Sequence, residues 1–195
     1  MSVQEGELKK REEEILSRAK ALFSKKGFHS LTVSDIVDSL GIARGTFYLY
    51  FKNKDDVYRR VLEETVSEIS KRLKRLPLDR PLEQLRENLL SILKLIEDDR
   101  ETARLIFYHP YRLNPEFDSI LEDFYGKVLN LIERALLRGM EMGIVRECNV
   151  SVVSRAILGA FIEVGKGILE GEIGAAEEAV DELLSFGLRG LLEGR

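Results

Sequence analysis

The clearest alternation of apolar and polar positions lies in residues 31–54, LTVSDIVDSLGIARGTFYLYFKNK. Apolar residues recur at helical spacing over residues 33–40 and again over residues 44–51, which predicts two short helices. Gly41 follows the last apolar position of the first helix, where a helix must end and the chain commonly adopts a positive φ. This stretch is therefore predicted to form a helix, a tight turn and a second helix, followed by a sharp exit.

Both short helices have further local signals. Thr32 precedes the first helix and Asp35 follows three positions later, as in a capping box. In the second helix, Ala43, Phe47 and Phe51 are expected to face inward. The outward set combines a cation, hydroxyl groups and aromatic rims: Arg44, Gly45, Thr46, Tyr48, Leu49 and Tyr50. A helix this short with such a face is typical of a DNA recognition helix.

The other segments that can be interpreted are also helical, so we expect an all-α protein of about nine helices. One helix over residues 7–26 ends at Gly27 and precedes the two short ones. Six more helices are expected at residues 54–76, 81–96, 101–108, 115–143, 149–171 (with Asn149 or Ser151 as the cap) and 175–192. We predict an N-terminal helix-turn-helix domain over residues 1–54 and a larger helical domain over residues 55–195.

The last two predicted helices, residues 149–171 and 175–192, are apolar over a wider arc than one buried stripe requires. A helix that is apolar on two faces either lies deep in its own core or packs against a second copy of the chain. Because both helices stand at the end of a small chain, we favour a homodimer in which they form a four-helix bundle.

The formal net charge of −4 conceals an uneven distribution. Residues 1–60 carry twelve Lys and Arg against nine Asp and Glu, whereas the remainder carries 18 against 25. A basic head on an acidic body suits a protein that contacts phosphate with one end. Ordinary surface variation is the alternative explanation.

Several classes of protein are disfavoured. The single cysteine, Cys148, excludes an intramolecular disulfide framework, and no apolar run reaches the roughly 18 residues that span a bilayer, so we expect a cytoplasmic protein without a membrane partner. Two histidines, one cysteine and no glycine-rich phosphate loop leave no catalytic or metal-binding constellation. We therefore expect no enzyme activity and no cofactor. A helical adaptor, whose helix-turn-helix binds protein, remains an alternative.

Residues from about 11 to 61 resemble the DNA-binding domain of the TetR family of bacterial transcriptional regulators. The resemblance lies in three successive motifs: IL-x3-A-x2-LF-x3-G from Ile15, T-x3-I-x4-GI from Thr32, and R-G-T-F-Y-x-Y-F-x-N-K from Arg44. It covers about a quarter of the chain closely, and the remainder agrees in the number and order of helices. The family implies a DNA-binding domain followed by a ligand-binding and dimerisation domain, acting most often as a repressor.

The resemblance also implies roles for particular residues. Positions that reach base edges or phosphate are matched by Ser34, Arg44, Gly45, Thr46, Tyr48, Leu49, Tyr50 and Lys54. Arg44 is the residue that can pair bidentately with guanine, whereas Lys54 and the tyrosines match phosphate contacts. Two positions depart from the family pattern. The position of Ala43 is frequently a serine in the family, and the position of Tyr50 is frequently a histidine.

The family further implies a small-molecule effector bound among the helices of the second domain, which moves the helix beginning at residue 54. Aromatic residues that could line an apolar cavity there include Phe107, Tyr108, Tyr111, Phe124 and Phe161. Aromatics at helical spacing are more often plain core, so this prediction has an obvious alternative. If they form a pocket, its scarcity of polar anchors suits a lipophilic or acyl-like ligand.

Overall fold

The computed structural model describes residues 3–77, 79–108 and 114–191, and within these ranges the chain forms helices and no strand. The helices are α1 (Val3–Ser30), α2 (Val33–Leu40), α3 (Arg44–Tyr48), α4 (Lys54–Arg72), α5 (Pro81–Asp98), α6 (Arg100–Phe107), α7 (Pro115–Glu141), α8 (Val150–Glu170) and α9 (Ala176–Leu191). The prediction of an all-α fold with about nine helices is confirmed. No helix in the described ranges is both long and apolar enough to cross a bilayer.

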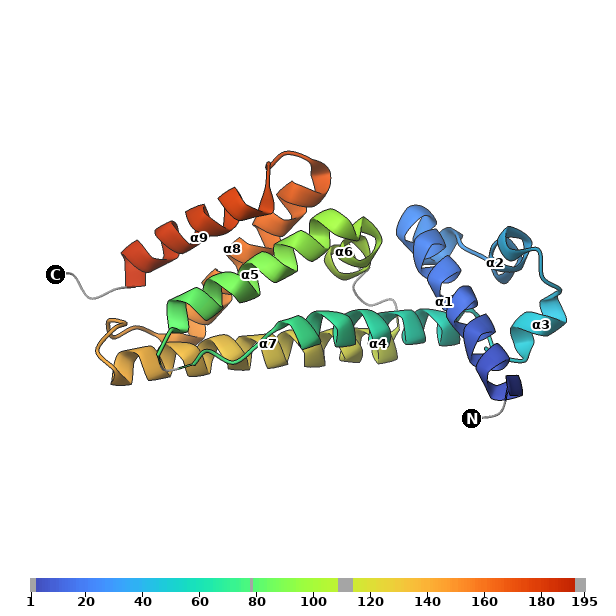
Figure 1. Ribbon diagram of the computed structural model, residues 1–195, viewed down its shortest axis with the longest axis horizontal. Helices are drawn as coiled ribbons and strands as arrows, with labels where there is room; N and C mark the ends of the chain where they lie inside the picture. The colour runs from blue at the N-terminus through green and yellow to red at the C-terminus, as the bar shows by residue number, and fades with distance from the viewer. Residues whose placement is uncertain (1–2, 78, 109–113, 192–195) are drawn as a thin grey trace.

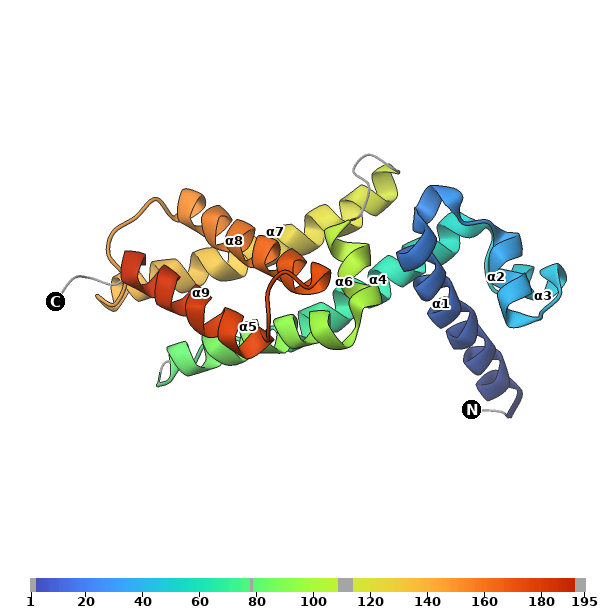
Figure 2. The same cartoon turned by 90° about the horizontal axis from the view of Figure 1, so that it is seen from above.

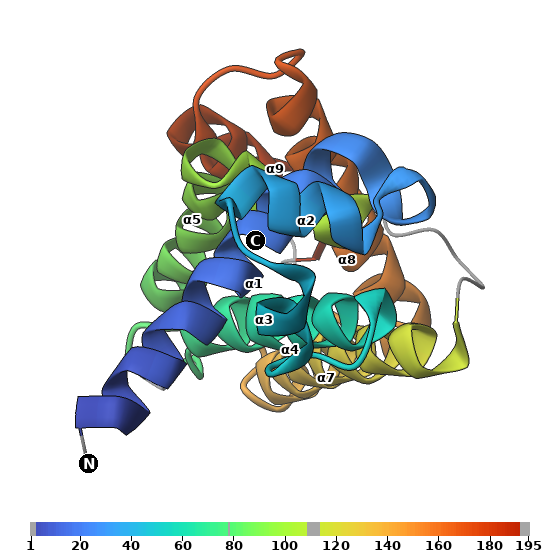
Figure 3. The same ribbon diagram turned by 90° about the vertical axis from the view of Figure 1, so that its right-hand side faces the viewer.

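The molecule is elongated, with α1 to α3 at one end and α5 to α9 gathered at the other (Figure 1). Helix α4 runs from the first group into the second and packs against both α1 and α7 (Figures 1 and 2). Viewed end-on, α2 and α3 form the outermost face of the N-terminal group (Figure 3). This face therefore projects away from the helical body.

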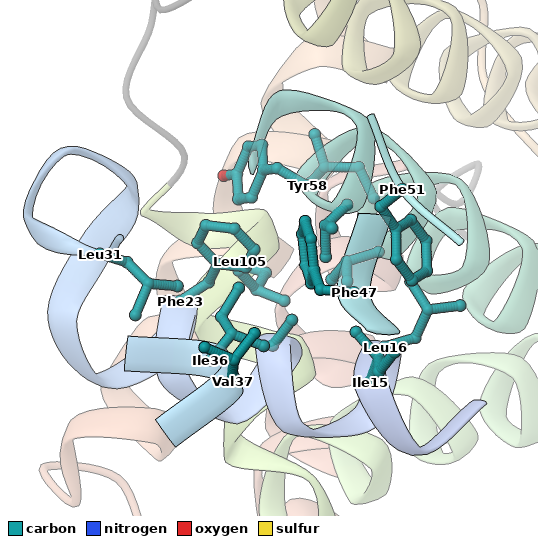
Figure 4. Close-up of a cluster of buried hydrophobic side chains, with 14 of the residues drawn as sticks. Ile15, Leu16, Phe23, Leu31, Ile36, Val37, Phe47, Phe51, Tyr58 and Leu105 are labelled. Atoms are coloured by element: carbon teal, nitrogen blue, oxygen red, sulfur yellow. The ribbon is translucent and has the colours of Figure 1, made fainter. Parts of the chain in front are cut away.

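The N-terminal group has its own hydrophobic core, which includes side chains from α4 and α6 (Figure 4). Its most deeply buried members, each at most 2% exposed, are Ile15, Ala19, Phe23, Leu31, Ile36, Val37, Phe47, Phe51, Val57, Tyr58, Val61, Leu62 and Phe117. Two further clusters of apolar residues fill the body between α5, α6, α7, α8 and α9. The recognition stretch is thus supported by a core that is distinct from those of the body.

The predicted break of the first helix at Gly27 is confirmed, although α1 continues beyond it, whereas the predicted end of α3 was wrong by three residues. Gly27, with φ 74° and ψ 164°, breaks the helical geometry of α1, but one more turn follows it as far as Ser30. Helix α3 ends at Tyr48 rather than at residue 51, and the amides of Leu49 and Tyr50 donate three residues back, to the carbonyls of Thr46 and Phe47, in a tight turn. That turn directs Phe51 into the core.

Helix α4 was predicted to reach residue 76, but it ends at Arg72. Leu73 is extended, with φ −81° and ψ 102°, and the backbone beyond it is bound by a side chain of α5. The buried Asn88 amide accepts from the Lys74 backbone N–H at 3.2 Å and donates to the Lys74 carbonyl at 2.6 Å. A tertiary contact therefore ends the helix before its local pattern does.

Candidate nucleic-acid interface

Helix α2 begins with the predicted capping box. The Thr32 hydroxyl accepts from the Asp35 backbone N–H at 3.2 Å, and the Asp35 carboxylate accepts from the Thr32 backbone N–H at 2.8 Å. Lys26 of α1 donates to the same carboxylate at 2.6 Å. The bond from Lys26 and the bonds from Thr32 together hold the pKa of Asp35 well below its usual value. The start of α2 is thus joined to the end of α1.

The turn between α2 and α3 has the backbone geometry that its glycine predicts. Gly41 adopts φ 64° and ψ 32°, and its N–H donates to the Asp38 carbonyl at 3.2 Å. The N–H of Ile42 donates to the Val37 carbonyl at 3.1 Å, so the last carbonyls of α2 are satisfied within the turn. The left-handed conformation at Gly41 is one that residues with a Cβ rarely adopt.

Helix α3 separates buried from exposed positions as predicted, with one correction. Phe47 and Phe51 are 0% and 2% exposed, whereas Tyr48 and Leu49 are 55% and 78% exposed. Ala43 was expected to face inward, but it is exposed because it precedes α3 as the N-cap residue in extended conformation. Two buried aromatic anchors, Phe47 within α3 and Phe51 just after it, therefore hold this short helix at the surface.

Most of the predicted DNA-contacting residues lie together at this end of the molecule. Arg44 and Gly45 are exposed like Tyr48 and Leu49, and the half-buried members of the set are Ser34, Thr46, Tyr50 and Lys54. The Arg44 guanidinium donates to the Ser34 hydroxyl, which joins the first turns of α2 and α3. Tyr50 packs partly against the N-terminal core.

Lys54 has structural contacts that the sequence did not reveal. Its ammonium donates to the Phe28 carbonyl at 2.7 Å and lies 4.2 Å from the centroid of the Phe28 ring. The Phe28 ring packs in turn against Tyr58 and Phe117, at centroid distances of 4.9 and 5.7 Å. An ammonium has three N–H donors, so this contact leaves capacity for a second partner.

A cavity of about 80 Å³ lies in the body, lined by side chains of α4 to α8 and by Leu73, which directly follows α4. Its lining consists of Ile69, Leu73, Ile92, Leu95, Ile96, Thr102, Ala103, Ile106, Phe107, Phe124, Tyr125, Val128, Leu158, Phe161 and Ile162. None of these residues is charged. The two hydroxyl groups among them have partners, since Thr102 donates to Asp99 at 2.5 Å and Tyr125 donates to the Ile106 carbonyl at 3.5 Å.

The structure brings together three of the five aromatic residues expected at a cavity, Phe107, Phe124 and Phe161. Tyr108 lies elsewhere, with its hydroxyl donating to the Glu170 carboxylate, and Tyr111 is outside the described residues. Sequence reasoning missed the aliphatic majority of the wall, because those residues have the same spacing as ordinary core positions. It also missed that Ile69 and Leu73 bring the end of α4 to the cavity.

Comparison with known proteins agrees with this geometry. Residues 15–61 match the model of a family described as bacterial regulatory proteins, tetR family. These residues span α2, α3 and most of the N-terminal core. Over the longer chain, the sequence is 26% identical over 176 residues to the HTH-type transcriptional regulator YfiR of Bacillus subtilis, covering 88% of this chain and 84% of that one.

Solved structures share the fold over nearly the whole length. A TetR-like transcriptional regulator from Rhodococcus sp. RHA1 superposes with a TM-score of 0.77 at 23% identity, covering 92% of this chain and 94% of that one. The regulator FadR from Bacillus subtilis, in complex with stearoyl-CoA, superposes with a TM-score of 0.73 at 22% identity, covering 91% and 97%. The family match of residues 15–61 and the shared fold over nearly the whole length agree, and the chain belongs to the tetR family of bacterial regulatory proteins, the helix-turn-helix transcriptional regulators.

Proposed function

We propose that this regulator is a repressor that binds a palindromic operator as a homodimer and is released by a small lipophilic ligand in its body. The observation that carries the DNA half of the proposal is the exposed face of α3. Tyr48 and Leu49 are more than half exposed beside Arg44, while Phe47 and Phe51 are buried directly beneath. Burying aromatic anchors to hold a five-residue helix at the surface suits insertion into a major groove.

In this proposal, residues 1–54 carry the DNA contacts and residues 55–195 carry the ligand and dimer contacts. Arg44 reads a base edge, with Gly45, Thr46 and Leu49 close to the groove, and Ser34 orients the guanidinium through its hydroxyl. Tyr48, Tyr50 and Lys54 contact phosphate and set the register on the duplex. Lys54 holds the Phe28 carbonyl with one N–H and has two others for a phosphate.

The proposed dimer forms through α8 and α9. Val152 on α8 is 62% exposed and Phe186 on α9 is 78% exposed, and both are apolar side chains that a second copy would cover. A two-fold dimer presents its recognition helices one DNA turn apart, roughly 34–36 Å, on the two halves of a palindrome. Sedimentation of the protein with a palindromic duplex should give two chains, or a multiple of two, per site.

The proposed effector binds in the apolar cavity. Its uncharged lining favours a lipophilic molecule, and the related fold of the Bacillus subtilis regulator FadR holds stearoyl-CoA. The cavity of about 80 Å³ is smaller than the roughly 300–1,000 Å³ of ordinary ligand sites, so binding must widen it. Since Ile69 and Leu73 form part of the wall, widening displaces the end of α4 and with it the spacing of the two recognition helices.

Native mass spectrometry of the purified protein tests the effector class. We expect a co-purified or added acyl compound to be retained by the folded chain. Retention of hydrophilic molecules or metal ions in its place would contradict the lipophilic assignment.

A gel-shift titration against the DNA upstream of its own gene tests the function itself. The regulator should bind with an affinity that falls steeply as salt rises, because Lys and Arg displace condensed counterions. The alternative is a helical adaptor that uses α2 and α3 for protein contacts. A tight protein complex together with no DNA affinity at any salt concentration would favour the adaptor.

A further inference from the structure

Helix α6 belongs to two parts of the molecule at once. Leu105 is 4% exposed and packs in the N-terminal core beside Phe23 of α1 (Figure 4). Its neighbours Thr102, Ala103 and Ile106 line the cavity of the body. A helix of eight residues with one side in each region is placed to transmit a displacement between them.

Asp99 joins α6 to α5 and holds both helix ends. Its backbone N–H donates to the Leu95 carbonyl at 2.8 Å, closing α5. Its carboxylate caps α6 by accepting from the Thr102 N–H at 3.0 Å and from the Thr102 hydroxyl at 2.5 Å. Leu95 of α5 and Thr102 of α6 both line the cavity. The two hydrogen-bond partners of Asp99 are therefore parts of the cavity wall.

The same carboxylate holds α1. Lys20 of α1 donates to Asp99 Oδ2 at 2.6 Å, and the two side chains are 23% and 31% exposed. Burial opposes ionisation of Asp99, but the bonds from Lys20 and Thr102 outweigh it and leave the pKa below its usual value. Partial shielding from solvent makes this pair less sensitive to salt than the exposed pairs of the surface.

We propose that Asp99 is a positioning residue that couples the width of the cavity to α1 through its ion pair with Lys20. This inference rests on the proposed function, in which an effector widens the cavity. Widening separates Leu95 from Thr102, shifts the α5–α6 corner that Asp99 forms, and pulls or releases Lys20. Because α1 packs on α2, and Lys26 of α1 holds the cap of α2, the shift reaches the recognition stretch.

Two substitutions isolate the ion pair from the rest of the structure. Asp99→Asn removes the charge but keeps a good N-cap for α6. Lys20→Met removes the cation but keeps an unbranched apolar stem. The matched control is the pair formed by Lys94 and Glu177, which has the same 2.6 Å separation but joins α5 to α9 within the body. Glu177→Gln should change stability slightly without affecting the coupling.

The test fills the cavity by substitution, so that it does not depend on knowing the effector. Leu158→Phe places an aromatic ring of α8 in the cavity. If Leu158→Phe does not fold, Ile162→Phe is used in its place. In the wild-type and Glu177→Gln backgrounds, filling should weaken DNA binding about tenfold, a usual size for allosteric coupling. In the Asp99→Asn and Lys20→Met backgrounds the same filling should change the dissociation constant less than about twofold.

Equal weakening in all four backgrounds would overturn the coupling, as would filling that leaves DNA binding unchanged in the wild type. Amide hydrogen exchange of α1 supplies a second measurement that needs no DNA. Filling should speed exchange in α1 of the wild type and leave it unchanged in Asp99→Asn. If the wild type binds no duplex at all, the proposed function fails, and exchange in α1 still decides whether Asp99 couples the two regions.

Discussion

The exposed face of α3 and the cavity of the body use aromatic and aliphatic residues in opposite ways. Around α3, buried Phe47 and Phe51 support an outer layer in which Leu49 is 78% exposed. Around the cavity, Phe107, Phe124 and Phe161 face inward, and no charged residue lines the wall within the described part of the chain. The first arrangement leaves apolar, aromatic and cationic side chains at the surface, whereas the second turns apolar side chains toward an uncharged cavity.

The difference explains why one region is easier to recognise than the other. Apolar and aromatic residues exposed side by side on one short helix point to an interaction site, although a single one would not. An apolar cavity wall has the same residue types and spacing as solid core, so its chemistry carries little information about what fills it.

The largest expected effect comes from removing an anchor beneath α3. Phe47→Ala should cost about 3–5 kcal/mol of unfolding free energy and abolish DNA binding, because the ring is fully buried in the small N-terminal core. Phe124→Ala is the control, since it deletes an aromatic ring from the cavity wall. It should lower stability yet preserve DNA binding, as measured by urea denaturation and gel shift. If Phe47→Ala preserved DNA binding and Phe124→Ala abolished it, the two regions would have been assigned the wrong roles.

Removing the proposed reader should have the next largest effect. Arg44→Ala should reduce discrimination between the operator and a scrambled duplex by about 1–3 kcal/mol while leaving stability nearly unchanged. The exposed Arg134 of α7 offers a control at the other end of the molecule. Competition titrations with both duplexes measure the ratio of the affinities for the operator and for the scrambled duplex. Unchanged discrimination in Arg44→Ala would assign base reading to another residue.

Much of the N-terminal end could be predicted from the sequence because its signals are local. The capping pair of Thr32 and Asp35 and the positive φ at Gly41 depend on residues a few positions apart. The early end of α4 depends on Asn88 in another helix, and the bond from Lys54 to the Phe28 carbonyl spans 26 positions. Likewise, nothing in the spacing of Thr102 distinguishes a cavity residue from an ordinary buried threonine.

A smaller effect should follow from loss of the α2 cap. Thr32→Ala should cost about 1 kcal/mol, because the Asp35 N–H loses its acceptor, whereas Thr32→Ser should retain most of the stability. Thermal unfolding of both variants measures the difference. An equal loss in the two variants would show that the methyl group, rather than the hydroxyl, matters.

The smallest effect is a pH dependence at the contact between the two regions. The pKa of Asp99 is lowered below its ordinary value of 3.8, so its charged contacts stabilise the fold fully above that pH. This contribution should disappear as pH falls below 3.8 through the lowered pKa of the folded state. Urea denaturation of the wild type and Asp99→Asn should therefore differ near neutral pH and converge in strong acid. A constant difference at all pH values would contradict this role of the charge.

DNA reading by this end of the molecule is tested most directly by the salt dependence of binding to an operator found upstream of the gene, measured by fluorescence anisotropy for the wild type and Lys54→Ala. We expect log affinity to fall linearly with log salt, and Lys54→Ala to have a slope about one unit shallower with sequence preference retained. An affinity that is independent of salt, or equal for operator and scrambled duplex, would contradict the claim that the exposed face of α3 reads DNA.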